Sequence, residues 1–200
     1  MIFQKVDEVF YLWAQKATDI LYQGESGERK EKIMYAVSYV LMEIVKIVTL
    51  LTFFWASNRL KNFLICMITL VSLRRYMGGF HRKTILGCEM QAVINFLIII
   101  HMGENINILQ WKYVVYIVSV LLIWRIIPIM SEDRCIYRKE KQMEFKCKAV
   151  IVLMLQSVLI QYLPIQYANF ILWTILFQDM EDIFKWVSQE RSKHEKRLKS

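Results

Sequence analysis

The chain has few residues that interrupt helices. Its 200 residues include two prolines and six glycines, and charged side chains gather in short clusters between long apolar runs. With 56% hydrophobic residues and a mean hydropathy of +0.31, it is too apolar for an ordinary soluble domain. The composition is typical of a single polytopic helical membrane domain.

Several signatures of enzymes and binding proteins are also missing. The sequence contains neither a His-Glu-x-x-His zinc motif nor a Gly-x-Ser-x-Gly nucleophile motif. The spacing of Cys135 and Cys147 matches no zinc pattern, so we expect no metal and no cofactor. The net charge of +8 fits contact with the anionic lipids of an inner leaflet. A nucleic-acid partner is not predicted, because no basic stripe is interleaved with exposed aromatics.

The apolar runs predict an all-α integral membrane protein with about six membrane segments. The runs cover residues 33–56, 62–73, 88–102, 113–130, 149–163 and 165–177. Because a span needs about 20 residues, the shorter runs would have to tilt, lie in a thinned bilayer or re-enter on the same side. Four spans with two re-entrant hairpins are therefore the alternative to six.

Basic clusters alternate with nearly neutral connections along the chain. Clusters precede the first run and follow the second, fourth and sixth, whereas the connections between them carry few basic residues. The positive-inside rule then places both termini in the cytoplasm, together with a loop at 74–87, a basic loop at 131–148 and a basic tail at 179–200. The four-span alternative keeps the same segments inside.

Residues 1–23 predict an amphipathic helix rather than a cleavable signal. Apolar residues recur at steps of three and four from Phe3 to Leu21, and Lys5, Asp7 and Glu8 interrupt any apolar core. Such a helix would lie on the membrane surface. Packing against the rest of the domain is the alternative.

The most informative stretch is Arg-Arg-Tyr-Met-Gly-Gly-Phe-His-Arg-Lys-Thr-Ile-Leu-Gly-Cys, residues 74–88. A thiol is a useful nucleophile only as thiolate, which requires a nearby base, a positive field or a helix N-terminus. Cys88 would begin an apolar helix directly after Gly87, and His81 stands seven residues before it. The cations of the same stretch are Arg74, Arg75, Arg82 and Lys83.

His81 and Cys88 can meet only if the chain bends between them. Seven residues of straight helix rise about 10.5 Å, whereas a nucleophile and its base must approach within about 3 Å. Gly87 would allow the bend, and Gly78 and Gly79 would permit a positive φ or close approach of a substrate. This spacing is a weak signal by itself, because a membrane-boundary loop that binds lipid phosphates could carry the same residues.

The remaining reactive or charged residues have simpler interpretations. Cys66 lies inside an apolar run and is predicted to be a packing residue. Cys135 and Cys147 fall in the cytoplasmic basic loop, where disulfides are disfavoured. Glu43 and Lys46 lie in the first run and would support a transporter or channel, although at three residues apart they can pair with each other.

The run Arg-Arg-Tyr-x-Gly-Gly-x-His-x-Lys-Thr-x-x-x-Cys resembles the signature of the accessory gene regulator B (AgrB-like) family. Its members are bacterial membrane cysteine endopeptidases that process quorum-sensing propeptides. Nearly the whole chain agrees in length, in its short spans, in the amphipathic start and in the basic loop opened by Pro128. Cys135 departs from the pattern where a proline is expected. The resemblance implies that Cys88 is the nucleophile and His81 the general base.

The resemblance also implies the reaction and the location. The enzyme would sit in the bacterial cell membrane and cleave the C-terminal tail of a small AgrD-like propeptide through a Cys88 thioester. Closure of a thiolactone or lactone would then give an autoinducing peptide. A homodimer is an alternative to a monomer. Glu89, Gln91 and Asn95 are candidates to orient the His81 side chain. The expected supporting or substrate-binding residues are Arg74, Arg75, Gly78, Gly79, Arg82 and Lys83. A small transporter or channel and a non-catalytic scaffold are the alternatives.

Overall fold

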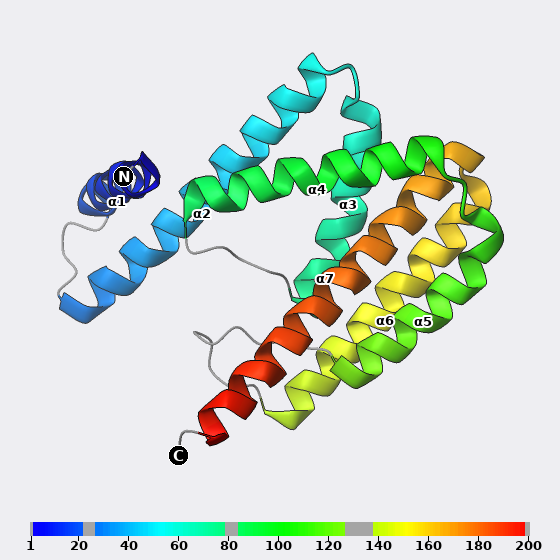
Figure 1. Ribbon diagram of the computed structural model, residues 1–200. Helices are drawn as coiled ribbons and strands as arrows, with labels where there is room; N and C mark the ends of the chain where they lie inside the picture. Colours follow the sequence, from blue (N-terminus) through cyan, green and yellow to red (C-terminus); the bar gives the residue numbers. More distant parts are fainter. Residues whose placement is uncertain (1, 22–26, 79–83, 127–137, 199–200) are drawn as a thin grey trace. The chain divides into compact units, whose positions relative to one another are not determined.

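The computed structural model describes residues 2–21, 27–78, 84–126 and 138–198, and within these ranges it contains helices and no strands (Figure 1). The helices are α1 (Ile2–Leu21), α2 (Gly27–Ala56), α3 (Leu60–Met77), α4 (Ile85–Asn105), the 3₁₀ turn η1 (Leu109–Trp111), α5 (Lys112–Ile126), α6 (Lys139–Tyr162) and α7 (Ile165–Leu198). The all-α prediction is confirmed.

Three helical stretches in the described ranges are long and apolar enough to cross a bilayer. They are residues 29–56 in α2, residues 86–105 in α4 and residues 109–126 in η1 and α5. They correspond to the first, third and fourth apolar runs of the sequence. The described parts of α3, α6 and α7 fall short of the same criterion, so the count of six segments stays a prediction.

The helices extend further into the polar sequence than the apolar runs do. α3 continues to Met77 and α4 begins at Ile85, so the loop expected at 74–87 is shorter at both ends. α6 begins at Lys139 and α7 reaches Leu198, so much of the expected basic loop and basic tail is helical. Apolar runs mark only the part of a helix that suits hydrocarbon, whereas Lys, Arg, Gln and Glu continue a helix well in water.

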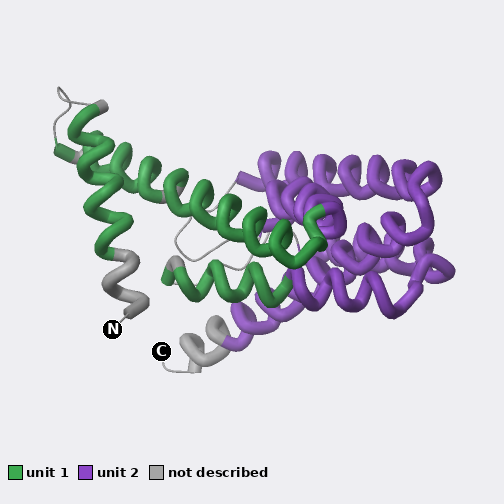
Figure 2. The backbone as a smooth tube through the Cα atoms, turned by 90° about the horizontal axis from the view of Figure 1, so that it is seen from above, with its two compact units in different colours: residues 1–60, 81–95 green, residues 61–80, 96–200 purple. Residues whose placement is uncertain are grey.

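The chain forms two compact units (Figure 2). The first comprises residues 1–60 and 81–95, and the second comprises residues 61–80 and 96–200. The helix α4 contributes its first half to one unit and its second half to the other.

In the first unit, α1 packs against α2. Ala14 and Thr18 of α1 are buried, and Asp19 forms an ion pair with Lys30 of α2 at 2.7 Å. On another face of α1, Trp13 remains 63% exposed. One face of α1 therefore packs inside the protein, as the alternative prediction has it, and the position on the membrane surface stays a prediction.

In the second unit, α7 packs against α5 and α6, and these three helices run alongside one another in Figure 1. The core joins four helices through Leu73 and Met77 of α3, Val115 and Ile123 of α5, Ala149, Leu153 and Ile160 of α6, and Ala168, Ile171, Leu172 and Ile175 of α7. Cys66 of α3 is fully buried, which confirms its expected packing role.

The buried side chain of Asn169 in α7 fixes the connection between α4 and η1. Its Nδ2 donates to the carbonyl oxygens of Gly103 and Ile106, both at 2.8 Å. Its Oδ1 accepts from the backbone N–H of Ile108 at 3.0 Å. Trp173 Nε1 donates to the Ile106 carbonyl at 2.9 Å. These bonds satisfy carbonyls at the end of α4 that have no partner inside the helix.

Gly103 allows α4 and α7 to approach closely. A Cβ at this position would lie 2.3 Å from Cδ1 of Phe170, whose ring is fully buried. We expect Gly103→Ala to destabilise the protein by roughly 1–3 kcal/mol, measured as a lower thermal unfolding temperature of the purified protein in detergent. In a Phe170→Leu background the same change should cost less, and additive losses would show that this contact is not the cause.

Candidate functional site

Cys88 lies in the first turn of α4, in the first unit. The helix begins at Ile85, and the N–H of Cys88 donates to the carbonyl of Thr84 at 3.0 Å. Thr is a residue type that favours the position before a helix, so the expectation that the helix starts at Cys88 is wrong by one turn. Gly87 lies inside the helix, so the bend that was expected at this glycine is also wrong. The Cys88 side chain is partly exposed.

Cys88 follows the first amides of α4 by no more than one turn. The first amides of a helix have no acceptor inside it, and they carry the positive end of the helix dipole. An oxyanion that formed beside Cys88 would therefore be stabilised by backbone dipoles.

Charged side chains in the same unit pair with each other. Lys46 Nζ lies 3.1 and 3.0 Å from the two carboxylate oxygens of Glu43 on α2, so the expected pairing of these residues is confirmed. Glu89 follows Cys88 and has a buried Oε1 with no hydrogen-bond partner among the described residues. Glu89 thus has a spare acceptor one residue after Cys88.

Arg74 and Gly78 are brought together by α7 in the second unit. Arg74 Nε donates to Gln178 Oε1 at 3.1 Å, and its guanidinium forms an ion pair with Glu181. Gln178 Nε2 donates to the Gly78 carbonyl at 3.5 Å and to Asp182 Oδ1 at 3.0 Å. Gly78 has a φ of +99°, so the predicted positive φ is confirmed at this glycine.

The other residues expected at the site divide into two groups. Arg75 is exposed in the last turn of α3, and its charge acts on Lys148 of α6. His81, Gly79, Arg82 and Lys83 lie outside the described residues, as does Cys135. The structure therefore joins Arg74 to Gly78 and places Cys88 in the other unit.

The acidic residues of α7 were missed by the sequence analysis, which assigned them to the basic tail. Asp179 is buried and accepts from Ser119 Oγ of α5 at 2.5 Å, and Asp182 is buried beside Gln178. The signal was present as Gln-Asp-Met-Glu-Asp directly after the last apolar run. Spacings of three and four place Gln178, Glu181 and Asp182 on one side of a helix.

Burial changes the titration of both aspartates, which lie beyond the predicted apolar segment of α7. Burial raises the pKa of Asp179 to about 7, although the hydrogen bond from Ser119 acts to lower it. Burial also raises the pKa of Asp182 to about 7, although the hydrogen bond from Gln178 acts to lower it. The charges of Asp179 and Glu181 add to the rise at Asp182, whereas Arg74 opposes it. One oxygen of each aspartate has no partner among the described residues.

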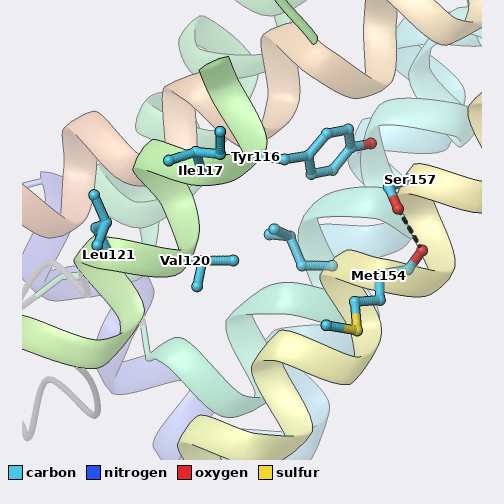
Figure 3. A pocket seen from close by; sticks show the side chains of 7 residues that line it. Tyr116, Ile117, Val120, Leu121, Met154 and Ser157 are labelled. Atoms are coloured by element: carbon cyan, nitrogen blue, oxygen red, sulfur yellow. Dashed lines mark hydrogen bonds between the residues drawn. The ribbon is translucent and has the colours of Figure 1, made fainter. Parts of the chain in front are cut away.

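A groove between α5 and α6 has a different character (Figure 3). Its volume is about 300 Å³, and Tyr116, Ile117, Val120, Leu121, Leu153, Met154 and Ser157 line it. Ser157 Oγ donates to the Met154 carbonyl at 2.7 Å, as the dashed line shows. Tyr116 is the one ionisable side chain in this lining, so the groove suits an apolar group rather than acid–base catalysis.

Comparison with known proteins gives one family and several relatives. The family model Accessory gene regulator B matches residues 14–181. An AgrB-like protein of Clostridium beijerinckii is 27% identical over 154 residues, 76% of each chain. Accessory gene regulator protein B of Staphylococcus intermedius is 28% identical over 116 residues, 58% of this chain and 61% of the relative. An AgrB-like protein 2 of Clostridium perfringens is 23% identical over 176 residues, 84% of this chain and 78% of the relative. No solved structure matches the chain.

The buried aspartates predict a stability that falls as the pH rises. Each carboxyl has a pKa of about 7 in the folded protein, against an ordinary value of 3.8. Its contribution to the stability of the fold is complete below the ordinary pKa and is lost as the pH rises through the folded pKa. Between pH 5 and pH 8 we expect the free energy of unfolding to fall by an amount on the order of a few kcal/mol. The measurement is a lower thermal unfolding temperature of the protein in detergent. Asp179→Asn and Asp182→Asn should each flatten this slope, whereas Glu144→Gln, at an exposed pair with Lys148, should not. Equal slopes in all variants would contradict the assignment.

Proposed function

The chain belongs to the accessory gene regulator B family, and on this premise we propose that it is a membrane cysteine endopeptidase acting on a small AgrD-like propeptide. The observation that carries the proposal is the place of Cys88, a partly exposed thiol in the first turn of α4 and within the matched residues. His81 precedes it by seven residues in the sequence. A Cys and a His provide the nucleophile and the general base that peptide cleavage needs.

The proposed cleavage has two chemical steps. The Cys88 thiolate attacks a backbone carbonyl of the propeptide, and the resulting oxyanion is stabilised by the first amides of α4. His81 then donates its proton to the leaving amine as the C–N bond breaks. The C-terminal tail departs with a new amino terminus, and the rest of the propeptide stays on Cys88 as a thioester.

Cyclisation would release the product and restore the enzyme. A Cys or Ser side chain of the bound peptide gives its proton to His81 and attacks the thioester carbonyl. A thiolactone or lactone forms as the bond to Cys88 Sγ breaks. Exchange of one thioester for another is nearly isoenergetic, so a site that excludes water favours the ring over hydrolysis.

The charges near the end of α3 suit the expected substrate. Arg75 is exposed, whereas Lys148 of the neighbouring α6 is paired with Glu144. An acidic propeptide tail would be attracted to Arg75, which is predicted to face the cytoplasm. Anionic lipids of the inner leaflet would be attracted in the same way.

The transporter alternative loses its main support in the structure. Glu43 and Lys46 neutralise each other along one side of α2, so they no longer argue for an ion path through the first membrane segment. We therefore retain one proposed function.

Removal of the nucleophile tests the proposal directly. Cys88→Ala, His81→Ala and the double variant should all reduce processing of a co-expressed AgrD-like propeptide by roughly 10³-fold or more, because either loss disables the attack. Cys88→Ser should process poorly, because a hydroxyl titrates far above a thiol. The readout is the cleaved tail on gels, with membrane abundance checked for each variant. Cys147→Ser, at an exposed cysteine of α6, is the matched control and should process normally. Substantial cleavage by Cys88→Ala would refute the proposal.

The proposed orientation can be tested by cysteine labelling in intact cells. In a background without native cysteines, Cys replacing Arg75, Lys141 or Glu190 should be protected from an impermeant maleimide. Cys replacing Ser57 should react, because the positive-inside rule places the connection after α2 outside. Labelling at position 75 from outside would overturn the cytoplasmic assignment of the site.

A further inference from the structure

The groove between α5 and α6 lies within the second unit and opens outward from it. Leu153 at its base is buried, whereas Ile117, Leu121 and Met154 at its edges are exposed (Figure 3). η1 and α5 together form one of the stretches that are long and apolar enough to cross a bilayer. An open apolar groove on such a helix is suited to contact with hydrocarbon rather than with water.

A tryptophan and an arginine continue the groove at the end of α5. Val120 and Leu121 line the groove. Trp124 and Arg125 lie one turn further along the same sides of the helix, because each follows a lining residue by four positions. Both side chains are exposed. A tryptophan next to a cation is typical of the level at which a membrane helix leaves hydrocarbon for the headgroups.

Lys146 joins α6 to the same end of α5. It lies seven residues before Leu153, a spacing that keeps it on the groove side of α6. Its Nζ donates to the Trp124 carbonyl at 2.6 Å and lies 5.8 Å from the centre of the Trp124 ring. Glu144, two positions before it, is paired with Lys148 instead. An ammonium has three donors, so Lys146 can bind an anion while it holds the neutral carbonyl.

The dimensions of the groove match one lipid chain in one leaflet. The eleven residues of α6 from Lys146 to Ser157 rise about 16 Å, and half of the hydrocarbon of a bilayer is about 15 Å thick. A helix is too wide to enter the groove, because one turn about 10 Å in diameter occupies roughly 400 Å³. The groove volume of about 300 Å³ therefore favours a thin acyl chain.

We propose that the α5–α6 groove binds one anionic phospholipid, with an acyl chain along the groove and the phosphate at Arg125 and Lys146. A guanidinium and an ammonium form charge-assisted hydrogen bonds with phosphate oxygens. The positive-inside rule places this end of the helices in the cytoplasm, where the leaflet carries the anionic lipids. The site is separate from the proposed peptidase chemistry, because it uses neither Cys88 nor His81.

Lipid retention by the delipidated full-length protein tests the headgroup part of the site. Native mass spectrometry from a neutral detergent counts the bound lipids after addition of phosphatidylglycerol, or of phosphatidylcholine with the same chains. We expect one phosphatidylglycerol per protein, bound at least about fivefold more tightly than phosphatidylcholine. Arg125→Gln and Lys146→Gln should each weaken the binding of phosphatidylglycerol about fivefold and leave that of phosphatidylcholine unchanged.

Lys112→Gln is the matched control for the two cations. Lys112 also joins α5 to α6, because its Nζ donates to Gln161 Oε1 at 3.1 Å. It also lies beside an aromatic ring, 5.1 Å from the centre of Tyr113. These contacts are at the opposite end of the helix pair, so phosphatidylglycerol should bind to this variant as it binds to the parent protein.

A larger side chain in the groove tests the place of the acyl chain. Ser157→Phe should fill the groove and remove the retention of both lipids. Val158→Phe adds the same ring at an exposed position that does not line the groove, and it should retain lipid like the parent. Phosphatidylglycerol should also raise the thermal unfolding temperature of the parent, because a ligand stabilises the state that binds it. The Arg125 and Lys146 variants decide the question if Ser157→Phe does not fold.

Three results would overturn the lipid site. The first is equal binding of phosphatidylglycerol and phosphatidylcholine by the parent, which would show no recognition of the headgroup. The second is loss of phosphatidylglycerol in Lys112→Gln but not in Lys146→Gln, which would place the headgroup at the wrong end. The third is a parent dimer without retained lipid that Ser157→Phe converts to a monomer, which would show that a second copy of the chain covers the groove.

Discussion

The second unit depends on the ion pair and hydrogen bonds that tie Arg74 to the polar side of α7. A guanidinium in an apolar helical unit must be neutralised and fully hydrogen-bonded, since an unpaired charge there is far costlier than a pair. Gln178 supplies an acceptor and Glu181 a neutralising charge, from successive turns of α7. The packing of α3 against α7 is therefore constrained in register as well as in contact area.

α7 is held by directional contacts at two places along its length. Asn169 binds backbone groups of the connection between α4 and η1, and Gln178 binds the end of α3 nine residues later. The apolar residues between them, such as Ile171 and Ile175, contribute burial but little directional preference. Hydrogen bonds at fixed positions specify which of many apolar packings is adopted.

The proposed chemistry draws on different properties of the two units. The first unit provides Cys88 at a helix start, where backbone amides favour a negative charge. In the second unit, Arg74 and Gly78, which are proposed to support the reaction, are both bound by Gln178 of α7.

The sequence by itself determined the helical membrane class, the separation of charged from apolar segments and the Cys88–His81 motif. Each of these features follows from local composition or spacing. The same holds for the pairing of Glu43 with Lys46, which are three residues apart on one helix. The start of α4 at Ile85 was missed because a threonine before a helix is a weaker signal than Gly87, which lies three residues further on. The contact of Arg74 with α7, and the burial of Asp179 and Asp182, were decided only by the tertiary structure. These residues are more than 100 positions apart from Arg74 in the chain, and no local pattern states which helices will pack together or which charges they will enclose.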